Sequence, residues 1–206
     1  MTIALSSTRG FDLPFVAPAS RGLSLPVLSL SQGRLQQWAL EAAAVEPTDR
    51  LLNLGFGGAG AVRRILRLTS AQVTAFDSSP AARELTRTLN RAALRSGRLR
   101  LAEGTVEMLP FRSRSFDVVT AFEVVQGWPS LATGLREARR VLGKGGRLVI
   151  ANERTLATGT ALAETGQGPL LPDTDALIAL CQRIGFRRVS AERHERKGWL
   201  RLVAVG

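Results

Sequence analysis

The sequence of 206 residues has one cysteine, one histidine and no tyrosine. A single cysteine, Cys181, excludes an internal disulfide framework and a zinc site built from cysteines. A single histidine, His194, argues against a metal centre with several histidine ligands and against a histidine-based catalytic triad. No metal site is therefore expected. Aromatic residues make up only 5% of the chain, which leaves few side chains on which nucleic-acid bases could stack.

Long apolar runs are also missing. No stretch of about 18 apolar residues occurs, so no transmembrane segment is expected. The N-terminus contains Arg9 but no basic segment followed by an apolar run, so no signal peptide is expected and the expected location is the cytoplasm. The length and the 45% hydrophobic content suit one domain with one core. We expect a single domain over 1–206, with 1–30 as an irregular N-terminal arm and 31–206 as the core.

Positive charge dominates, with a formal net charge of +11 and 28 basic against 17 acidic residues. Only Lys144 and Lys197 are lysines. Such a balance is typical of proteins that bind phosphates. It also fits a general preference for arginine over lysine, because the arginines are spread along the chain. An anionic acceptor or partner therefore stays open, whereas a nucleic acid is not favoured, since aromatics are few and no accessory nucleic-acid module occurs.

One helix is expected to carry a basic stripe. Arg83, Arg87, Arg91 and Arg95 recur every four residues and so share one helical face. Two interpretations remain: a solvated face paired with acids such as Glu84, or a surface that binds phosphates.

Short apolar runs alternate with segments of helical periodicity along the chain. Strands are expected at 50–54, 72–77, 99–102, 116–122, 147–152, 187–192 and 199–205. Helices are expected at 31–45, 61–68, 79–95, 131–142 and 173–184. This alternation predicts an α/β fold with a doubly wound, mostly parallel sheet covered on both faces. The last two strands form a hairpin around residues 194–198.

A glycine loop follows the first expected strand. Gly55, Gly57 and Gly60 fit the spacing G-x-G-x-x-G, and Asp77 ends the second strand 22 residues after Gly55. In open α/β sheets ligands bind beyond the carboxyl ends of the strands. Glycines let the backbone approach a ligand, and a carboxylate at Asp77 can accept both hydroxyls of a ribose. Taken alone, the pattern leaves open a nucleotide-linked oxidoreductase that uses NAD and a purely structural turn.

Five segments from Thr48 onward carry a more specific resemblance: DRLLNLGFGGAG, VTAFDSSP, EGTVEMLPFRSRSFDVV, EARRVLGKGGRLVIANE and IGFRRV. They resemble the class I S-adenosylmethionine (SAM)-dependent methyltransferases, in the branch with ubiquinone- and menaquinone-biosynthesis enzymes. The resemblance implies a Rossmann-like, seven-stranded sheet with an antiparallel last strand. It also implies SAM as cofactor and methyl transfer to a small or medium-sized acceptor.

The resemblance implies that nine residues at the strand ends contact SAM: Asn53, Gly55, Phe56, Gly57, Asp77, Ser78, Thr105, Val106 and Phe122. The first four would lie under the methionine part of SAM. Asp77 would hold the ribose hydroxyls, with Ser78 beside the adenine. Thr105 and Val106 would flank the adenine edge, and Phe122 would line the sulfonium side.

Four positions depart from the family pattern. Asn53 replaces an acid, Ala59 replaces a glycine, Thr105 replaces an aspartate, and Gln126 replaces a histidine that many relatives carry. These departures keep a second hypothesis open, a non-catalytic SAM- or nucleotide-binding partner protein with a degenerate methyltransferase fold.

Methyl transfer needs mainly a nucleophile held about 3 Å from an electrophilic carbon. A general base is needed only for a weakly acidic or protonated acceptor, and the candidates near the strand ends are Glu123 and Glu153. Either carboxylate can equally be structural or solvated. The N-terminal arm and the connector 154–172 are expected to cover the substrate. The sequence identifies neither the acceptor atom nor the oligomeric state.

Overall fold

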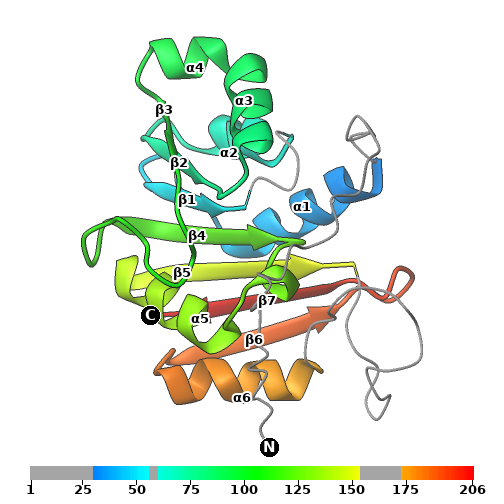
Figure 1. Cartoon of the computed structure of the whole chain (residues 1–206). Coiled ribbons are helices and arrows are strands. Elements are labelled where there is room, and N and C mark those ends of the chain that lie inside the picture. Colours follow the sequence, from blue (N-terminus) through cyan, green and yellow to red (C-terminus); the bar gives the residue numbers. More distant parts are fainter. Residues whose placement is uncertain (1–29, 56–59, 154–172) are drawn as a thin grey trace, which may run out of the picture.

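The computed structural model describes residues 30–55, 60–153 and 173–206, which build one seven-stranded sheet between layers of helices (Figure 1). The strand order is β3-β2-β1-β4-β5-β7-β6. Strands β1 to β5 pair in parallel, and β7 runs antiparallel to both β5 and β6. The structure thus confirms the expected α/β sheet, including the C-terminal hairpin.

The strands lie close to the expected positions. Their bounds are β1 Leu51–Leu54, β2 Val73–Phe76, β3 Leu99–Ala102, β4 Phe116–Phe122, β5 Leu142–Asn152, β6 Arg188–Arg193 and β7 Leu200–Val205. Strand β5 begins five residues before the expected start at 147, because Leu142 already pairs with Phe116 ahead of a register shift in β4. The glycines that follow Leu142 hide this early pairing from a prediction based on local strand propensity.

The helices are α1 Leu30–Ala43, α2 Gly60–Leu68, α3 Pro80–Leu89, α4 Arg91–Arg95, α5 Leu131–Val141 and α6 Thr174–Ile184, with a 3₁₀ turn η1 at Val125–Gly127. The single helix expected over 79–95 is wrong at Asn90, where α3 ends and α4 begins. The Asn90 side chain donates a hydrogen bond to the Thr86 carbonyl at 2.9 Å. Its backbone (φ −125°, ψ 30°) leaves the helical region, as asparagine often does when its amide competes for helix carbonyls.

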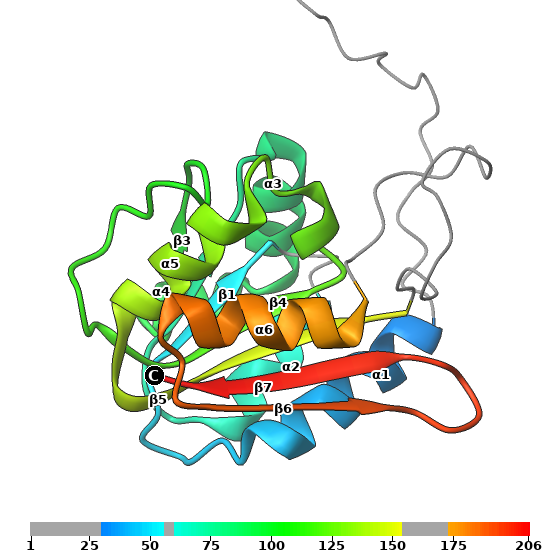
Figure 2. The same cartoon turned by 90° about the horizontal axis from the view of Figure 1, so that it is seen from below.

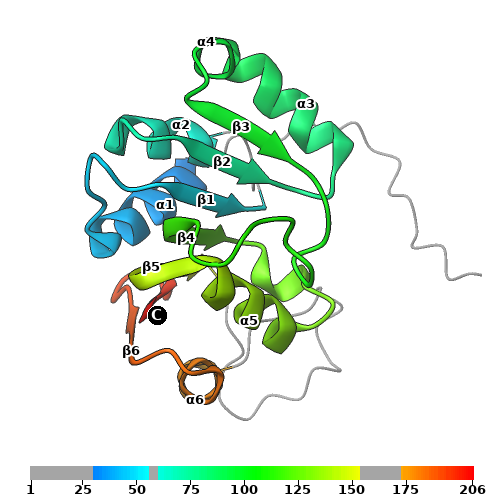
Figure 3. The same cartoon turned by 90° about the vertical axis from the view of Figure 1, so that its left-hand side faces the viewer.

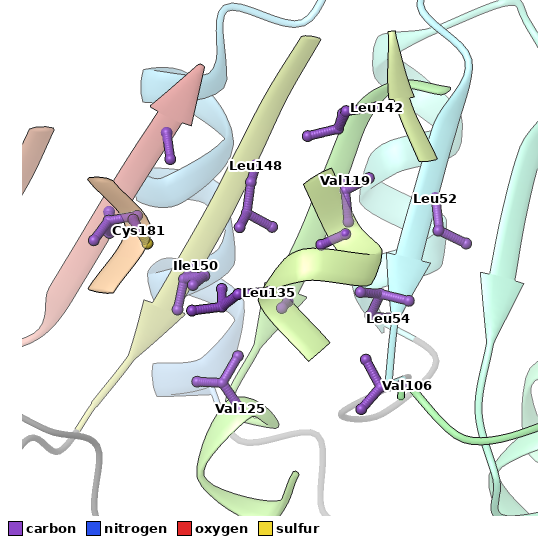
Figure 4. Close-up of a cluster of buried hydrophobic side chains, with 14 of the residues drawn as sticks. Leu52, Leu54, Val106, Val119, Val125, Leu135, Leu142, Leu148, Ile150 and Cys181 are labelled. Carbon is purple, nitrogen blue, oxygen red and sulfur yellow. The ribbon is translucent and has the colours of Figure 1, made fainter. Parts of the chain in front are cut away.

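Side chains alternate between the two faces of the sheet, so one core lies on each face. On one face, Leu51, Val118 and Val149 pack with α1 and α2. On the other, residues such as Leu148 and Ile150 pack with α5 and α6 (Figures 3 and 4). Cys181 lies in this second core, and burial raises the pKa of its thiol to about 12.

Local capping sets where the helices begin and end. Asp173 caps α6 by accepting a hydrogen bond from the Ala176 N–H at 2.8 Å, and Ser79 caps α3 in the same way. Gly185 ends α6 with φ +102°, a left-handed conformation that glycine adopts at little cost. Figure 2 shows the result, with α6 alongside β6 and β7. These caps make the chain return to the sheet where the next strand starts.

Candidate active site

Strands β1 to β5 all end at one edge of the sheet, because they run parallel to one another. In Figure 1 this edge lies at the right, where the arrows of β4 and β5 point. The predicted cofactor and acceptor residues in the described part of the chain all lie on or next to these strand ends. The structure therefore brings them to one region, although their side chains differ in burial.

Gly55 is the position at which the chain leaves β1. Its φ is +71°, and its N–H donates a hydrogen bond to the Phe76 carbonyl at 2.8 Å. A Cβ atom placed there would overlap Cγ1 of Val124, which follows β4. Only glycine therefore allows this turn to pass so close to β4. Phe56 and Gly57, which were predicted to continue the cofactor loop, lie outside the described residues.

Asp77 follows β2 and is half-buried. Its Oδ1 accepts a hydrogen bond from the Ser79 N–H at 2.8 Å, and its own N–H donates to the Ala102 carbonyl at 3.2 Å. The carboxylate is thus held at the end of β2 while its neighbour Ser78 is exposed. This position suits the predicted contact with ribose hydroxyls.

Arg83 ties the loop after β2 to the loop after β3. Its Nη1 donates to the carbonyls of Asp77 (3.1 Å) and Ser78 (3.3 Å), and its Nη2 pairs with Glu103 at 2.5 Å. The Arg83 side chain is only 18% exposed, so it does not belong to a solvated basic stripe. One turn later, Arg87 does pair with Glu84 on the surface, as one of the two interpretations expected.

The residues expected at the adenine edge follow β3. Thr105 is exposed and its carbonyl accepts a hydrogen bond from the Met108 N–H at 3.2 Å, whereas Val106 is buried in the core. Met108 is 77% exposed. The sequence did not predict it as a site residue. An exposed apolar side chain beside Thr105 is well suited to cover a flat ring, but nothing in its local pattern distinguishes it from a buried methionine.

Two other predicted cofactor residues have buried side chains. Asn53 is fully buried in β1, and its Nδ2 donates to Thr120 Oγ1 of β4 at 3.2 Å. Its Oδ1 is buried and has no hydrogen-bond partner among the residues that the structure describes. Phe122 packs in the core under α1 and α2 and is 1% exposed. The contacts with SAM that the resemblance assigns to these two residues stay predictions.

Glu123 and Glu153, the two candidate bases, contact each other directly. Glu123 follows β4 with φ +58°, and its N–H donates to the Ala151 carbonyl at 2.9 Å. The Glu153 N–H donates to Oε1 of Glu123. Burial raises the pKa of the Glu123 carboxyl, this hydrogen bond opposes the rise, and the nearby Glu153 carboxylate adds to it.

Gln126 and Asn152 extend this polar group. Gln126 donates through Nε2 to the Glu123 carbonyl at 2.8 Å and accepts from Asn152 Nδ2 at 2.6 Å. In the described part of the chain, the buried atoms Asn152 Oδ1 and Glu153 Oε1 have no hydrogen-bond partner. Buried acceptors without a partner are costly, so a ligand that donates hydrogen bonds would stabilise them. The sequence showed Gln126 only as a departure, since its contact with Asn152 depends on how β4 and β5 align.

Comparison with known proteins decides the family. A model described as "Methyltransferase domain" matches residues 52–150. A demethylmenaquinone methyltransferase from Mycolicibacterium gilvum is 33% identical over 191 residues, covering 86% of this chain and 80% of that relative. The chain belongs to the class I SAM-dependent methyltransferases. The cofactor of this family is SAM, which agrees with the sequence prediction and not with NAD.

Two further matches of the chain have lower sequence identity. A 2-methyl-6-phytyl-1,4-hydroquinone methyltransferase from Oryza sativa subsp. japonica is 28% identical and covers 73% of this chain. The chain spans less than half the length of several curated relatives that it matches. A solved putative methyltransferase from Bacillus halodurans has a TM-score of 0.68 at 15% identity, covering 82% of this chain and 97% of that one, and it shows the shared fold.

The described residues fit SAM. Gly55 takes the chain out of β1 in a left-handed turn that packs against Val124, and Asp77 places a carboxylate at the end of β2. Within the described ranges, no group of three or more His, Cys, Asp or Glu residues could hold a metal ion. In the same ranges, no helix is long and apolar enough to cross a membrane.

Proposed function

We propose that this methyltransferase transfers a methyl group from SAM to a small or medium-sized acceptor whose reacting part is a hydroxylated ring of the quinol type. The observation that carries the proposal is the buried polar group at the ends of β4 and β5. There, Glu123 lies beside acceptor oxygens of Asn152 and Glu153 that lack partners in the described part of the chain. A ring hydroxyl donates the hydrogen bond that this group lacks. The names of two relatives, which act on a demethylmenaquinone and a hydroquinone, support the same class.

Bound SAM would supply an electrophilic methyl group; its bond to the sulfonium sulfur would break as the new carbon–carbon bond forms, and the sulfur would keep the electron pair as the thioether of S-adenosylhomocysteine. Asp77 accepts hydrogen bonds from ribose hydroxyls, and the turn at Gly55 lets the backbone approach the cofactor. Asn152 Oδ1 accepts a hydrogen bond from the acceptor and orients its ring. Glu123 takes the hydroxyl proton, which increases the electron density on the ring carbon that forms the new carbon–carbon bond. The proton displaced from that carbon then leaves to solvent, and the ring recovers its aromaticity.

The expected roles of Glu123 and Asp77 predict different effects: loss of the first should lower kcat, and loss of the second should weaken cofactor binding. Glu123→Gln keeps the size of the side chain but removes the base, so kcat should fall by roughly 10²-fold or more, with unchanged affinity for S-adenosylhomocysteine. Asp77→Ala should weaken S-adenosylhomocysteine binding by about tenfold or more. Glu195→Gln, an exposed change in the β6–β7 hairpin, is the matched control and should alter neither.

The test combines calorimetric titration with S-adenosylhomocysteine, with NAD as the negative control, and an anaerobic assay with methyl-labelled SAM and reduced 1,4-naphthoquinone. In the wild type, kcat should fall as the pH drops through the raised pKa of Glu123, because the base must be ionised; Glu123→Gln should lose this dependence. Binding of S-adenosylhomocysteine without labelled product would favour the non-catalytic partner protein. Absence of binding would refute both hypotheses.

A further inference from the structure

A basic cavity lies at the opposite end of the sheet from the SAM site. It has a volume of about 350 Å³, and five cationic side chains line it: Arg114, Arg139, Arg140, Lys144 and Arg187. A cavity of this size can hold a small ligand.

The fold assembles these cations from four separate segments. Arg114 lies in the turn before β4, where its N–H donates to the Arg140 carbonyl at 3.0 Å. Arg139 and Arg140 occupy the last turn of α5, and Lys144 lies near the start of β5. Arg187 precedes β6, with its N–H bonded to the Val205 carbonyl at 2.8 Å. All of these segments lie at the starting ends of β4, β5 and β6, the end that faces the viewer in Figure 3.

The positive charge of this cavity is only partly neutralised. Arg140 pairs with Glu137 at 2.6 Å. The other four cationic side chains are exposed, and none of the ion pairs found among the described residues involves them. Gly206 also lines the cavity. A single negative charge at Gly206 would not balance the four cationic side chains that have no ion pair among the described residues. Like charges gathered in a concave site repel one another and create a strong positive potential.

The side chain of Arg139 contacts the residue that ends α6. A Cβ atom at Gly185, the left-handed residue that ends α6, would lie 3.2–3.3 Å from Cζ, Nε and Nη2 of Arg139. The guanidinium group therefore lies directly against the end of α6. Cations in a last helical turn also favour the helix dipole. That effect accounts for arginines at the end of α5, but not for the convergence of Arg114, Lys144 and Arg187 on the same cavity.

We propose that this cavity binds a phosphate-bearing anion about the size of a pyrophosphate group, at a site separate from the SAM site. A guanidinium group forms paired hydrogen bonds with phosphate oxygens, and an ammonium group adds a mobile point charge. An anion here relieves the repulsion among the cations. Soluble phosphate compounds and anionic lipid headgroups carry this same chemistry.

The test is calorimetric titration with inorganic pyrophosphate while saturating S-adenosylhomocysteine occupies the SAM site. The double variant Arg139→Gln/Lys144→Gln should bind pyrophosphate at least about tenfold more weakly than the wild type. The control Arg91→Gln/Arg95→Gln removes the same charge from exposed positions on α4 and should leave binding unchanged. All three proteins should bind S-adenosylhomocysteine equally.

A second arm uses flotation of the protein with phosphatidylglycerol vesicles, with phosphatidylcholine vesicles for comparison. Pyrophosphate binding without vesicle binding assigns the cavity to a soluble phosphate compound. Vesicle binding that Arg139→Gln/Lys144→Gln abolishes assigns it to a lipid headgroup. The proposal is overturned if the wild type binds neither probe, or if the α4 control loses as much binding as the cavity variant.

Discussion

Arg83 shows how one side chain can link two loops of the predicted SAM site without being predicted to contact SAM. Its guanidinium group bonds to two carbonyls of the loop after β2 and to a carboxylate after β3. The spacing of arginines along the helix suggested equivalence with Arg87, but the first turn of α3 lies directly against the strand ends. Arg83 and Arg87 are the same residue type, and their different contacts follow from their positions along α3.

We expect Arg83→Gln to weaken S-adenosylhomocysteine binding by about tenfold, because the Asp77 loop loses its link to Glu103. Arg87→Gln, one turn further along α3, is the control and should bind normally. Calorimetry measures the affinity, and circular dichroism melting curves monitor the fold. A variant that melts much earlier but binds normally when folded would show that Arg83 serves stability alone.

Asn53 illustrates a departure from the family pattern whose effect depends on burial. The residue lies inside the sheet and donates to Thr120, so an uncharged amide avoids the cost of burying a carboxylate there. The substitution of an acid by Asn53 therefore does not by itself argue for a degenerate site.

At the scale of elements, the exit from β1 depends on the end of β4. Gly55 and Gly145 have nearly the same positive φ, +71° and +75°. Their surroundings differ, because a Cβ at Gly55 would clash with Val124 whereas a Cβ at Gly145 would meet no atom within 4 Å. An alanine substitution at each of the two glycines therefore distinguishes the free-energy cost of the backbone conformation from the cost of a steric clash.

We expect Gly145→Ala to lower the free energy of unfolding by about 1–2 kcal/mol, the cost of a left-handed alanine. Gly55→Ala should lose about 1–3 kcal/mol more through the clash, and its affinity for S-adenosylhomocysteine should fall. Urea unfolding measures both stabilities. Equal losses in the two variants would mean that Val124 moves aside freely and does not constrain the turn.

The segment Leu109–Phe111, part of the motif that carried the family resemblance, is held by α5. Glu137 accepts a hydrogen bond from the Leu109 N–H at 2.8 Å, and Arg140 donates to the carbonyls of Leu109 (3.0 Å) and Phe111 (2.7 Å). The motif and the helix thus form one unit, although 28 residues separate Leu109 from Glu137.

At the scale of the whole molecule, paired carboxylates determine the response to acid. Hydrogen bonds from Arg50 and Arg140 lower the pKa of Asp117 and of Glu137, respectively, below their ordinary values of 3.8 and 4.5. A carboxyl group with a lowered pKa in the folded state contributes stability above its ordinary pKa and loses it as the pH falls. The protein should therefore lose stability progressively below about pH 4.5.

Glu137→Gln tests this linkage. At neutral pH the variant should melt at a lower temperature than the wild type, and the difference should shrink as the pH falls below the ordinary glutamate value of 4.5. Glu195→Gln, in the exposed hairpin, should follow the wild-type curve. Melting curves recorded between pH 3 and pH 8 measure the effect. A difference that stays constant with pH would show that Glu137 acts through packing and not through its charge.

The two ends of the sheet differ in chemistry. The carboxyl ends of the strands gather Asp77, Glu123 and Glu153, whereas the starting ends of β4 to β6 gather arginines and Lys144 around the basic cavity. The net charge of +11 hides this separation, which exists only because parallel strands bring their starts together at one edge and their ends together at the other.

The sequence by itself determined the element order, the mostly parallel sheet and the family, because periodicity, glycine turns, helix caps and the segments around Asp77 and Leu109 act over short distances. Local sequence could not determine the break at Asn90, the early start of β5 or the contact of Gln126 with Asn152. Each of these depends on strand register or on competition for one hydrogen bond. Only the tertiary structure decided which of the many charged side chains lie next to one another, since contact between residues distant in sequence follows from packing and not from composition.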